Sequence, residues 1–115
     1  MIFIVDDDEI MAKCVKKAIK GEARIFSNAI EAMAEISENN IPEMIFLDIL
    51  LNGPDGFTFL NELMSYEDTI KIPTVIVSSY DIGDKDLSGY GVVGILNKDS
   101  MTPNDIRYYV NEYAK

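Results

Sequence analysis

Five short apolar segments alternate with segments of helical periodicity, and this alternation restricts the fold more than any other feature of the sequence. The apolar segments, each of strand length, are 1–5, 23–26, 44–47, 74–77 and 92–96. The first helical segment is 10–20, and the second begins at a cap formed by Ser27 or Asn28 and runs to about 38. The third runs from 57 to about 65, and a short or frayed helix is expected within 80–91. The last helical segment begins at a Thr102 cap and runs to about 114. Short connections between such elements predict an α/β fold, with a mostly parallel sheet covered by helices on both faces. The length of 115 residues indicates a single domain, 1–115.

The composition excludes several classes of function. The net charge is −10 and there is no histidine, which argues against direct binding of nucleic acid and favours cations or basic surfaces as partners. No apolar run reaches the roughly 18 residues of a membrane span. The single cysteine, Cys14, precludes a disulfide framework, as expected for a cytoplasmic protein. Its place on the apolar stripe of the first helix predicts a buried, inert thiol.

Reactive side chains follow four of the five predicted strands. Asp6 and Asp7 follow the first, Asp48 the third, Ser78 the fourth and Lys98 the fifth. A parallel sheet brings its carboxyl ends to one edge, where open α/β sheets bind their ligands. Three carboxylates at one edge need a cation, and Mg²⁺ is the expected one because it binds carboxylates together with phosphate oxygens. Asp48 is then a candidate nucleophile toward phosphorus, and Ser78 and Lys98 would supply a hydroxyl donor and a positive charge to a phosphoryl group.

Five short motifs, in order along the chain, resemble those of the receiver domains of two-component response regulators, of the chemotaxis-regulator kind. They are Val5-Asp6-Asp7, Leu47-Asp48, Pro54-Asp55-Gly56, Val77-Ser78-Ser79 and Lys98. The resemblance covers essentially the whole chain. It implies a flavodoxin-like, doubly wound five-stranded parallel sheet with the strand order 2-1-3-4-5.

The same resemblance implies a signalling function rather than an enzyme. A histidine kinase or histidine phosphotransfer protein would donate a phosphoryl group from a phosphohistidine to Asp48. Mg²⁺ would be held by Asp7, Asp48 and the backbone carbonyl of Leu50, with Asp6 supporting from close by. Phosphorylation would then change the binding of a downstream protein or a fused output domain.

Two positions depart from the family pattern. Asp99 stands where a proline usually follows the lysine, so the Lys98–Asp99 peptide is expected to be trans or strained. The anion at Asp99 would also compete with a phosphoryl group for Lys98. Ile95 occupies the usual aromatic switch position, and Tyr80 or Tyr90 would have to substitute for it.

Two bulky side chains near the acceptor predict slow hydrolysis of the phosphoaspartate. Leu50 and Tyr80 lie two residues after Asp48 and Ser78, respectively. Neither carries an amide or an acid that could orient an attacking water molecule. A phosphoryl group on Asp48 is therefore expected to persist.

Two other functions are compatible with the sequence. A pseudo-receiver would keep the fold and signal by binding alone, and Ile95 and Asp99 favour this alternative. The second is a phosphohydrolase with an aspartyl nucleophile. Such enzymes carry an Asp-x-Asp motif at the nucleophile, whereas this chain has Asp48-Ile49-Leu50 and lacks the second acid. Ordinary structural interpretations also exist, with 6–9 as a helix cap, Ser78 as a loop hydroxyl and Lys98 as a solvated lysine.

Overall fold

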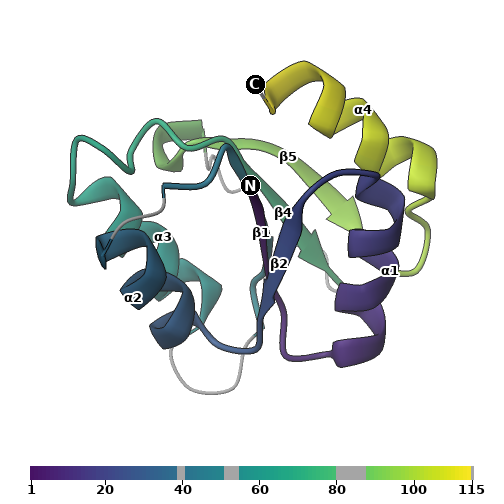
Figure 1. The fold of residues 1–115 in the computed structure, drawn as a ribbon, viewed down its shortest axis with the longest axis horizontal. Coiled ribbons are helices and arrows are strands. Elements are labelled where there is room, and N and C mark those ends of the chain that lie inside the picture. Colours follow the sequence, from purple (N-terminus) through teal and green to yellow (C-terminus); the bar gives the residue numbers. More distant parts are fainter. Residues whose placement is uncertain (39–40, 51–54, 80–87, 115) are drawn as a thin grey trace.

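The computed structural model describes residues 1–38, 41–50, 55–79 and 88–114 (Figure 1). Its strands are β1 (Ile2–Val5), β2 (Ala23–Phe26), β3 (Met44–Asp48), β4 (Thr74–Ser78) and β5 (Val92–Asn97). Its helices are α1 (Glu9–Ile19), α2 (Ala29–Glu38), α3 (Gly56–Met64) and α4 (Pro103–Tyr113), with a 3₁₀ turn at Ser88–Tyr90. All five predicted strands and the four longer helices are confirmed. The short helix expected within 80–91 falls mostly outside the described residues.

The five strands form one parallel sheet in the order β2-β1-β3-β4-β5, which confirms the predicted flavodoxin-like topology. α2 and α3 cover one face, and α1 and α4 cover the other (Figure 1). The register pairs Val5 with Leu47 and Asp48 with Val77, so these strands end at a common edge. In the part of the chain that the structure describes, no helix is long and apolar enough to cross a membrane.

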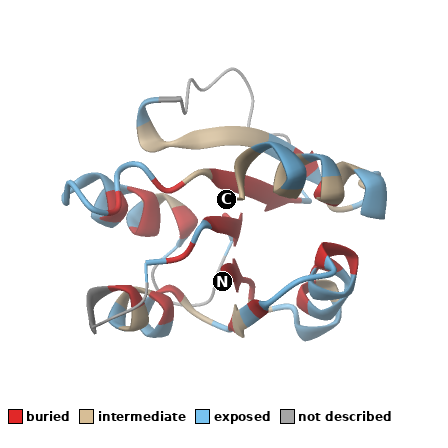
Figure 2. Cartoon of the chain, turned by 45° about the horizontal axis from the view of Figure 1, so that its top comes forward, coloured by how far each residue is buried: buried red, intermediate tan, exposed pale blue. Residues whose placement is uncertain are grey.

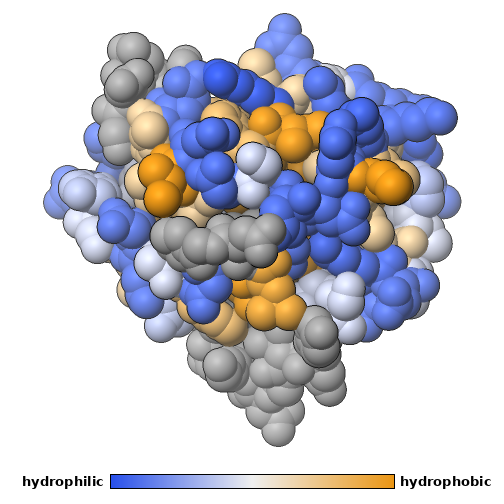
Figure 3. All heavy atoms as spheres, turned by 90° about the horizontal axis from the view of Figure 1, so that it is seen from below, coloured by the Kyte–Doolittle hydropathy of each residue, from blue (hydrophilic) through white to orange (hydrophobic). Residues whose placement is uncertain are grey.

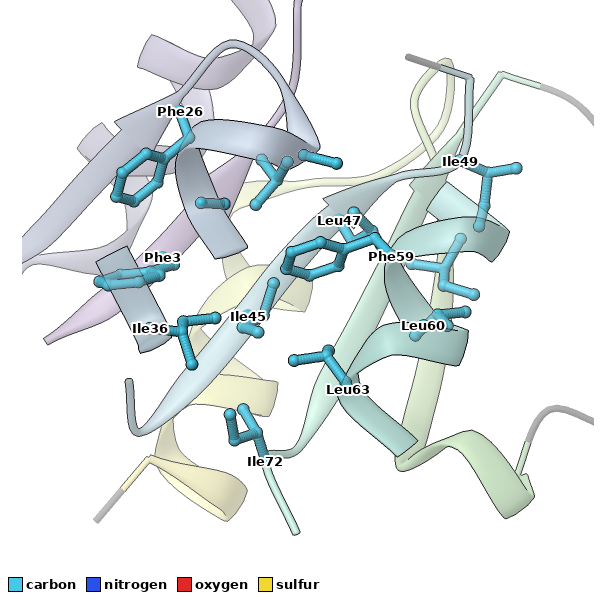
Figure 4. Close-up of a cluster of buried hydrophobic side chains, with 14 residues drawn as sticks. Phe3, Phe26, Ile36, Ile45, Leu47, Ile49, Phe59, Leu60, Leu63 and Ile72 are labelled. Atoms are coloured by element: carbon cyan, nitrogen blue, oxygen red, sulfur yellow. The ribbon is translucent and has the colours of Figure 1, made fainter. Parts of the chain in front are cut away.

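The central strands β1, β3 and β4 are buried along their whole length because helices cover both faces of the sheet (Figure 2). On the α2 and α3 side, side chains from strands and helices meet in one cluster, in which the ring centroids of Phe3 and Phe26 are 4.7 Å apart (Figure 4). Continuous apolar runs are what such doubly covered strands require. The packed core therefore holds the carboxyl ends of β1 and β3 in a defined position.

The buried face of α1 differs from the predicted apolar stripe. The buried residues of α1 are Ala12, Val15, Ala18 and Ile19. Ile10, in contrast, is 78% exposed, and Cys14 is exposed. The prediction of a buried Cys14 is wrong because the apolar stripe of α1 is wider than the face that the sheet and α4 cover. Ala12 lies on the covered face instead, where a small side chain allows close packing.

Side-chain caps determine where α1 and α3 begin. The Asp8 carboxylate accepts a hydrogen bond from the backbone N–H of Met11 (3.2 Å) at the start of α1. The Asp55 carboxylate accepts one from the N–H of Thr58 (2.9 Å) at the start of α3. These caps satisfy N–H groups that have no partner within the helix. They begin both helices close behind the strand ends that carry the predicted site residues.

Candidate functional site

Three carboxylates lie together at the carboxyl edge of the sheet, as the sequence predicts. Asp6 and Asp7 follow β1, and Asp48 is the last residue of β3. One carboxylate oxygen from each of the three residues lies within 4.8 Å of the other two oxygens. Asp6 and Asp48 are only 4% and 5% exposed, whereas Asp7 is more accessible. Such a cluster of oxygen donors is a suitable site for a hard divalent cation.

Lys98, at the end of β5, reaches across to this cluster. Its Nζ lies 3.1 Å from Asp48 Oδ2 and 3.2 Å from Asp6 Oδ2. Its backbone N–H donates to the carbonyl oxygen of Ser78 (2.9 Å), which fixes β5 against β4 at this edge. The side chain is only 9% exposed, so both ion pairs are shielded from water. The predicted lysine is therefore brought to the predicted acceptor.

Asp99 does not redirect this lysine. The described residues contain no cis peptide, so the Lys98–Asp99 bond is trans. The exposed Asp99 donates its backbone N–H to the Asn97 side chain (2.7 Å). Within the described chain, the ion pairs of Lys98 are with Asp6 and Asp48. The competition expected from Asp99 is thus not part of this arrangement.

The electrostatics of the pocket show an excess of negative charge. Burial raises the pKa of Asp6 from 3.8 to about 6, and the negative charge of Asp48 adds to this rise. The backbone N–H of Asp8, which donates to Asp6 Oδ1 (2.9 Å), and the ammonium of Lys98 oppose the rise. Burial by itself would lower the pKa of Lys98, but the ion pairs with Asp6 and Asp48 outweigh it and raise the pKa above its usual value. Lys98 is therefore charged at neutral pH, and one ammonium faces three acids.

Ser78 and Leu50 flank Asp48. Ser78, the last residue of β4, is 2% exposed, one position beyond the Val77 that pairs with Asp48. Leu50 donates its backbone N–H to Asp48 Oδ1 (3.1 Å), and its side chain points outward with 52% of its surface exposed. Tyr80, the other residue expected to affect hydrolysis, lies outside the described residues.

Gly56 packs against the end of β3 that carries Asp48, a role the sequence does not reveal beyond a glycine in a turn. Its N–H donates to the carbonyl oxygen of Ile49 (2.8 Å), which ties the first residue of α3 to the residue after Asp48. A Cβ at Gly56 would lie 2.7 Å from Ile49 Cα and 2.8 Å from the Asp48 carbonyl oxygen. Only glycine permits this close approach of two backbone segments.

Gly56→Ala is therefore expected to destabilise the domain by about 1–3 kcal/mol, because the added methyl group meets backbone that cannot move aside easily. Urea unfolding monitored by circular dichroism measures the change. Gly21→Ala is the matched control, since a Cβ there would have no neighbour closer than 4.0 Å. Equal effects of the two substitutions would contradict this account of Gly56.

Tyr90 does not substitute for the aromatic switch residue, whose usual position is occupied by Ile95. Ile95 is 46% exposed on β5. Tyr90 precedes β5 at the amino end of the sheet, where the N–H of Thr74 donates to the carbonyl oxygen of Gly91 (3.0 Å). Ser78 lies at the other end of β4, about 13 Å away along the strand. Tyr90 therefore cannot contact Ser78, and the other expected substitute, Tyr80, lies outside the described residues.

The surface at this edge is mixed in character. The strands run toward the bottom of Figure 1, so Figure 3, seen from below, looks onto their carboxyl ends. Hydrophilic residues gather near the middle of this face, and hydrophobic residues appear in separate patches around them (Figure 3).

A parallel α/β sheet with three acids, a hydroxyl and a lysine at one edge defines a class of protein, and the chain belongs to the response regulator receiver domain family, whose profile matches residues 2–111. Response regulator PleD of Caulobacter vibrioides is 28% identical over 82 residues, which is 70% of this chain and 18% of PleD. The match therefore spans less than a fifth of the length of that curated relative.

Two solved structures illustrate the similarity. A protein from Chloroflexus aurantiacus J-10-fl, described as a response regulator, is 28% identical and has a TM-score of 0.84, over 96% of this chain and 93% of the other. The receiver domain of NtrX from Brucella abortus is 24% identical and has a TM-score of 0.83, over 97% and 96% of the two chains. The latter likeness concerns the fold alone.

Proposed function

We propose that this receiver domain accepts a phosphoryl group on Asp48 from a phosphohistidine of a histidine kinase or histidine phosphotransfer protein. The observation that carries the proposal is the position of Lys98 Nζ, 3.1 Å from the buried Asp48 carboxylate. An Asp48 oxygen would form a bond to phosphorus while the phosphorus–nitrogen bond breaks, and the histidine nitrogen would keep the electron pair. Lys98 and the Ser78 hydroxyl would stabilise charge on the phosphoryl oxygens.

We further propose that Asp7 and Asp48, with Asp6 close by and the backbone carbonyl of Leu50, hold Mg²⁺. The support is the chemistry of the donors, three carboxylates whose oxygen atoms lie within 4.8 Å of one another. When bound, the ion would supply positive charge to the phosphoryl oxygens. Burial, with a smaller contribution from the charge of Asp48, raises the pKa of Asp6, and a bound divalent cation would stabilise its ionised form.

Intact-mass measurement after incubation with acetyl phosphate tests the proposal. We expect a mass increase of one phosphoryl group in the presence of Mg²⁺ and none when EDTA removes the metal. No increase under either condition would favour the pseudo-receiver, in which the same fold signals by binding alone. Release of free phosphate from phosphate esters with turnover would instead favour the phosphohydrolase.

The output of the switch would be a change in binding to a downstream protein or a fused output domain, in the cytoplasm. Receiver domains are signalling modules, which supports a binding output over a catalytic one. Because the match covers 18% of PleD, the activity of that whole protein is not transferred to this chain.

Leu50→Asn is expected to accelerate hydrolysis of the phosphoaspartate several-fold. The Leu50 side chain is apolar and exposed close to Asp48, so it cannot orient a water molecule, whereas an amide at the same position could hold an attacking water molecule. The decay of the phosphorylated mass after removal of acetyl phosphate measures the rate. A wild-type half-life of seconds that the substitution leaves unchanged would count against slow hydrolysis.

A further inference from the structure

Two adjoining hollows form a groove between α2 and α3, on the opposite face of the sheet from α1 and α4. The first, with a volume of about 280 Å³, includes Ile30, Met33 and Phe59. The second, of about 300 Å³, shares Met33 and extends to Ile41 and Tyr66. These five residues define what we call the α2–α3 groove. None of them belongs to the phosphoacceptor site.

The groove exposes large apolar side chains at both ends. Ile30 is 65% exposed, Ile41 is 51% exposed and Tyr66 is 57% exposed, whereas Phe59 is 1% exposed and forms the floor. Figure 4 shows Phe59 packed over the sheet among the core side chains beneath this surface. Isolated apolar residues are common on surfaces, but several around one concavity are typical of a docking site.

The charge around the groove has one sign. α2 and α3 contain Glu31, Glu35, Glu38 and Glu62 and neither lysine nor arginine. Among the described residues that line the two hollows, the charged ones are Glu62 and Asp68. Glu35 is paired with Arg24 of β2, so Glu62 and Asp68 form the acidic rim of the groove.

This charge distribution selects the occupant. A second copy docked through the same groove would place acidic rims against each other, which is unfavourable. We propose that the α2–α3 groove binds an amphipathic helix of a partner protein, whose apolar face is flanked by lysine or arginine. The apolar side chains would enter the two hollows, and the basic residues would face the acidic rim. This interaction does not depend on phosphorylation of Asp48.

The dimensions fit such a helix. α2 has 10 residues and α3 has 9, so the two helices that flank the groove are each about 14–15 Å long. A partner helix of about three turns would span it, with apolar residues spaced by about two turns reaching both hollows.

The test uses two synthetic peptides of 14 residues (about four turns) with the same leucine face and either lysine or glutamate on the other face. Methyl NMR of the full chain follows Ile30, Met33 and Ile41 during titration. We expect the leucine–lysine peptide to shift these methyl signals in a saturable manner. The leucine–glutamate peptide should bind roughly tenfold more weakly or not at all.

Matched variants separate the groove from general attraction to an acidic protein. Ile30→Ser should weaken binding of the leucine–lysine peptide roughly tenfold, whereas Ile10→Ser, at an even more exposed isoleucine on α1, should leave it unchanged. Equal effects of the two substitutions, equal binding of the two peptides, or shifts centred on α1 would overturn the proposal. So would absence of any shift at millimolar peptide, or self-association of the protein that Ile30→Ser abolishes.

Discussion

Asp48→Asn is expected to abolish phosphoryl uptake from acetyl phosphate. The amide keeps the size of the side chain but has no anionic oxygen to attack phosphorus. Lys98 keeps its ion pair with Asp6 (3.2 Å), so the domain should still fold. Intact mass after incubation with acetyl phosphate and Mg²⁺ measures uptake, and thermal unfolding verifies that the variant is folded.

Asp99→Asn is the matched control, because Asp99 is an acid adjacent to Lys98 that is exposed and makes no ion pair with it among the described contacts. We expect this variant to take up the phosphoryl group as the wild type does. A folded Asp48→Asn variant that still gains a phosphoryl group would place the acceptor elsewhere and refute the assignment.

Asp6→Asn is expected to stabilise the metal-free domain at pH 7.5 by on the order of 2–3 kcal/mol, the free energy that corresponds to a pKa raised from 3.8 to about 6. Because the folded state binds the Asp6 proton more tightly than the unfolded state, the stability from this group is fully present below about pH 4. It is lost as the pH rises through about 6. The free energy of unfolding of the wild type in EDTA should therefore fall across this window, and the fall should be smaller in the variant.

Mg²⁺ should reverse the stability advantage that the Asp6→Asn variant is expected to have over the wild type in the absence of metal. In the wild type the cation would bind the ionised cluster and stabilise the folded state, whereas the variant lacks one of the three carboxylates and should gain less. Urea unfolding at pH 5 and 7.5, with EDTA or with Mg²⁺, measures both effects. A variant that is less stable than the wild type in EDTA at pH 7.5 would show that the Asp6–Lys98 pair, rather than burial, dominates at this position.

The carboxylate cluster combines a role in function with a cost in stability. Asp6 is buried, and its raised pKa means that its ionised form costs stability when no cation is bound, as is common where function requires unfavourable charge. Lys98 relieves part of this cost by pairing with both acids.

Most of the fold could be predicted from local patterns. The runs at 2–5, 44–48 and 74–78 are buried on both faces, and continuous apolar sequence followed by a polar residue indicates such strands directly. The Thr102 cap was equally readable, since Thr102 and Asp105 form a reciprocal capping box at the start of α4. The failures concern orientation: Cys14 has helical spacing typical of a core residue yet is exposed.

Which reactive residues end which strands follows from local sequence alone, because strand identity and strand ends are encoded in neighbouring residues. The folded arrangement was needed to show that Lys98 pairs with Asp6, 92 positions away in the chain, and not with the adjacent Asp99. The tertiary structure also excluded Tyr90 as a partner of Ser78 and showed why residue 56 must be glycine. The physical reason is that such contacts depend on how the strands pair and how closely two backbone segments approach, which local periodicity does not encode.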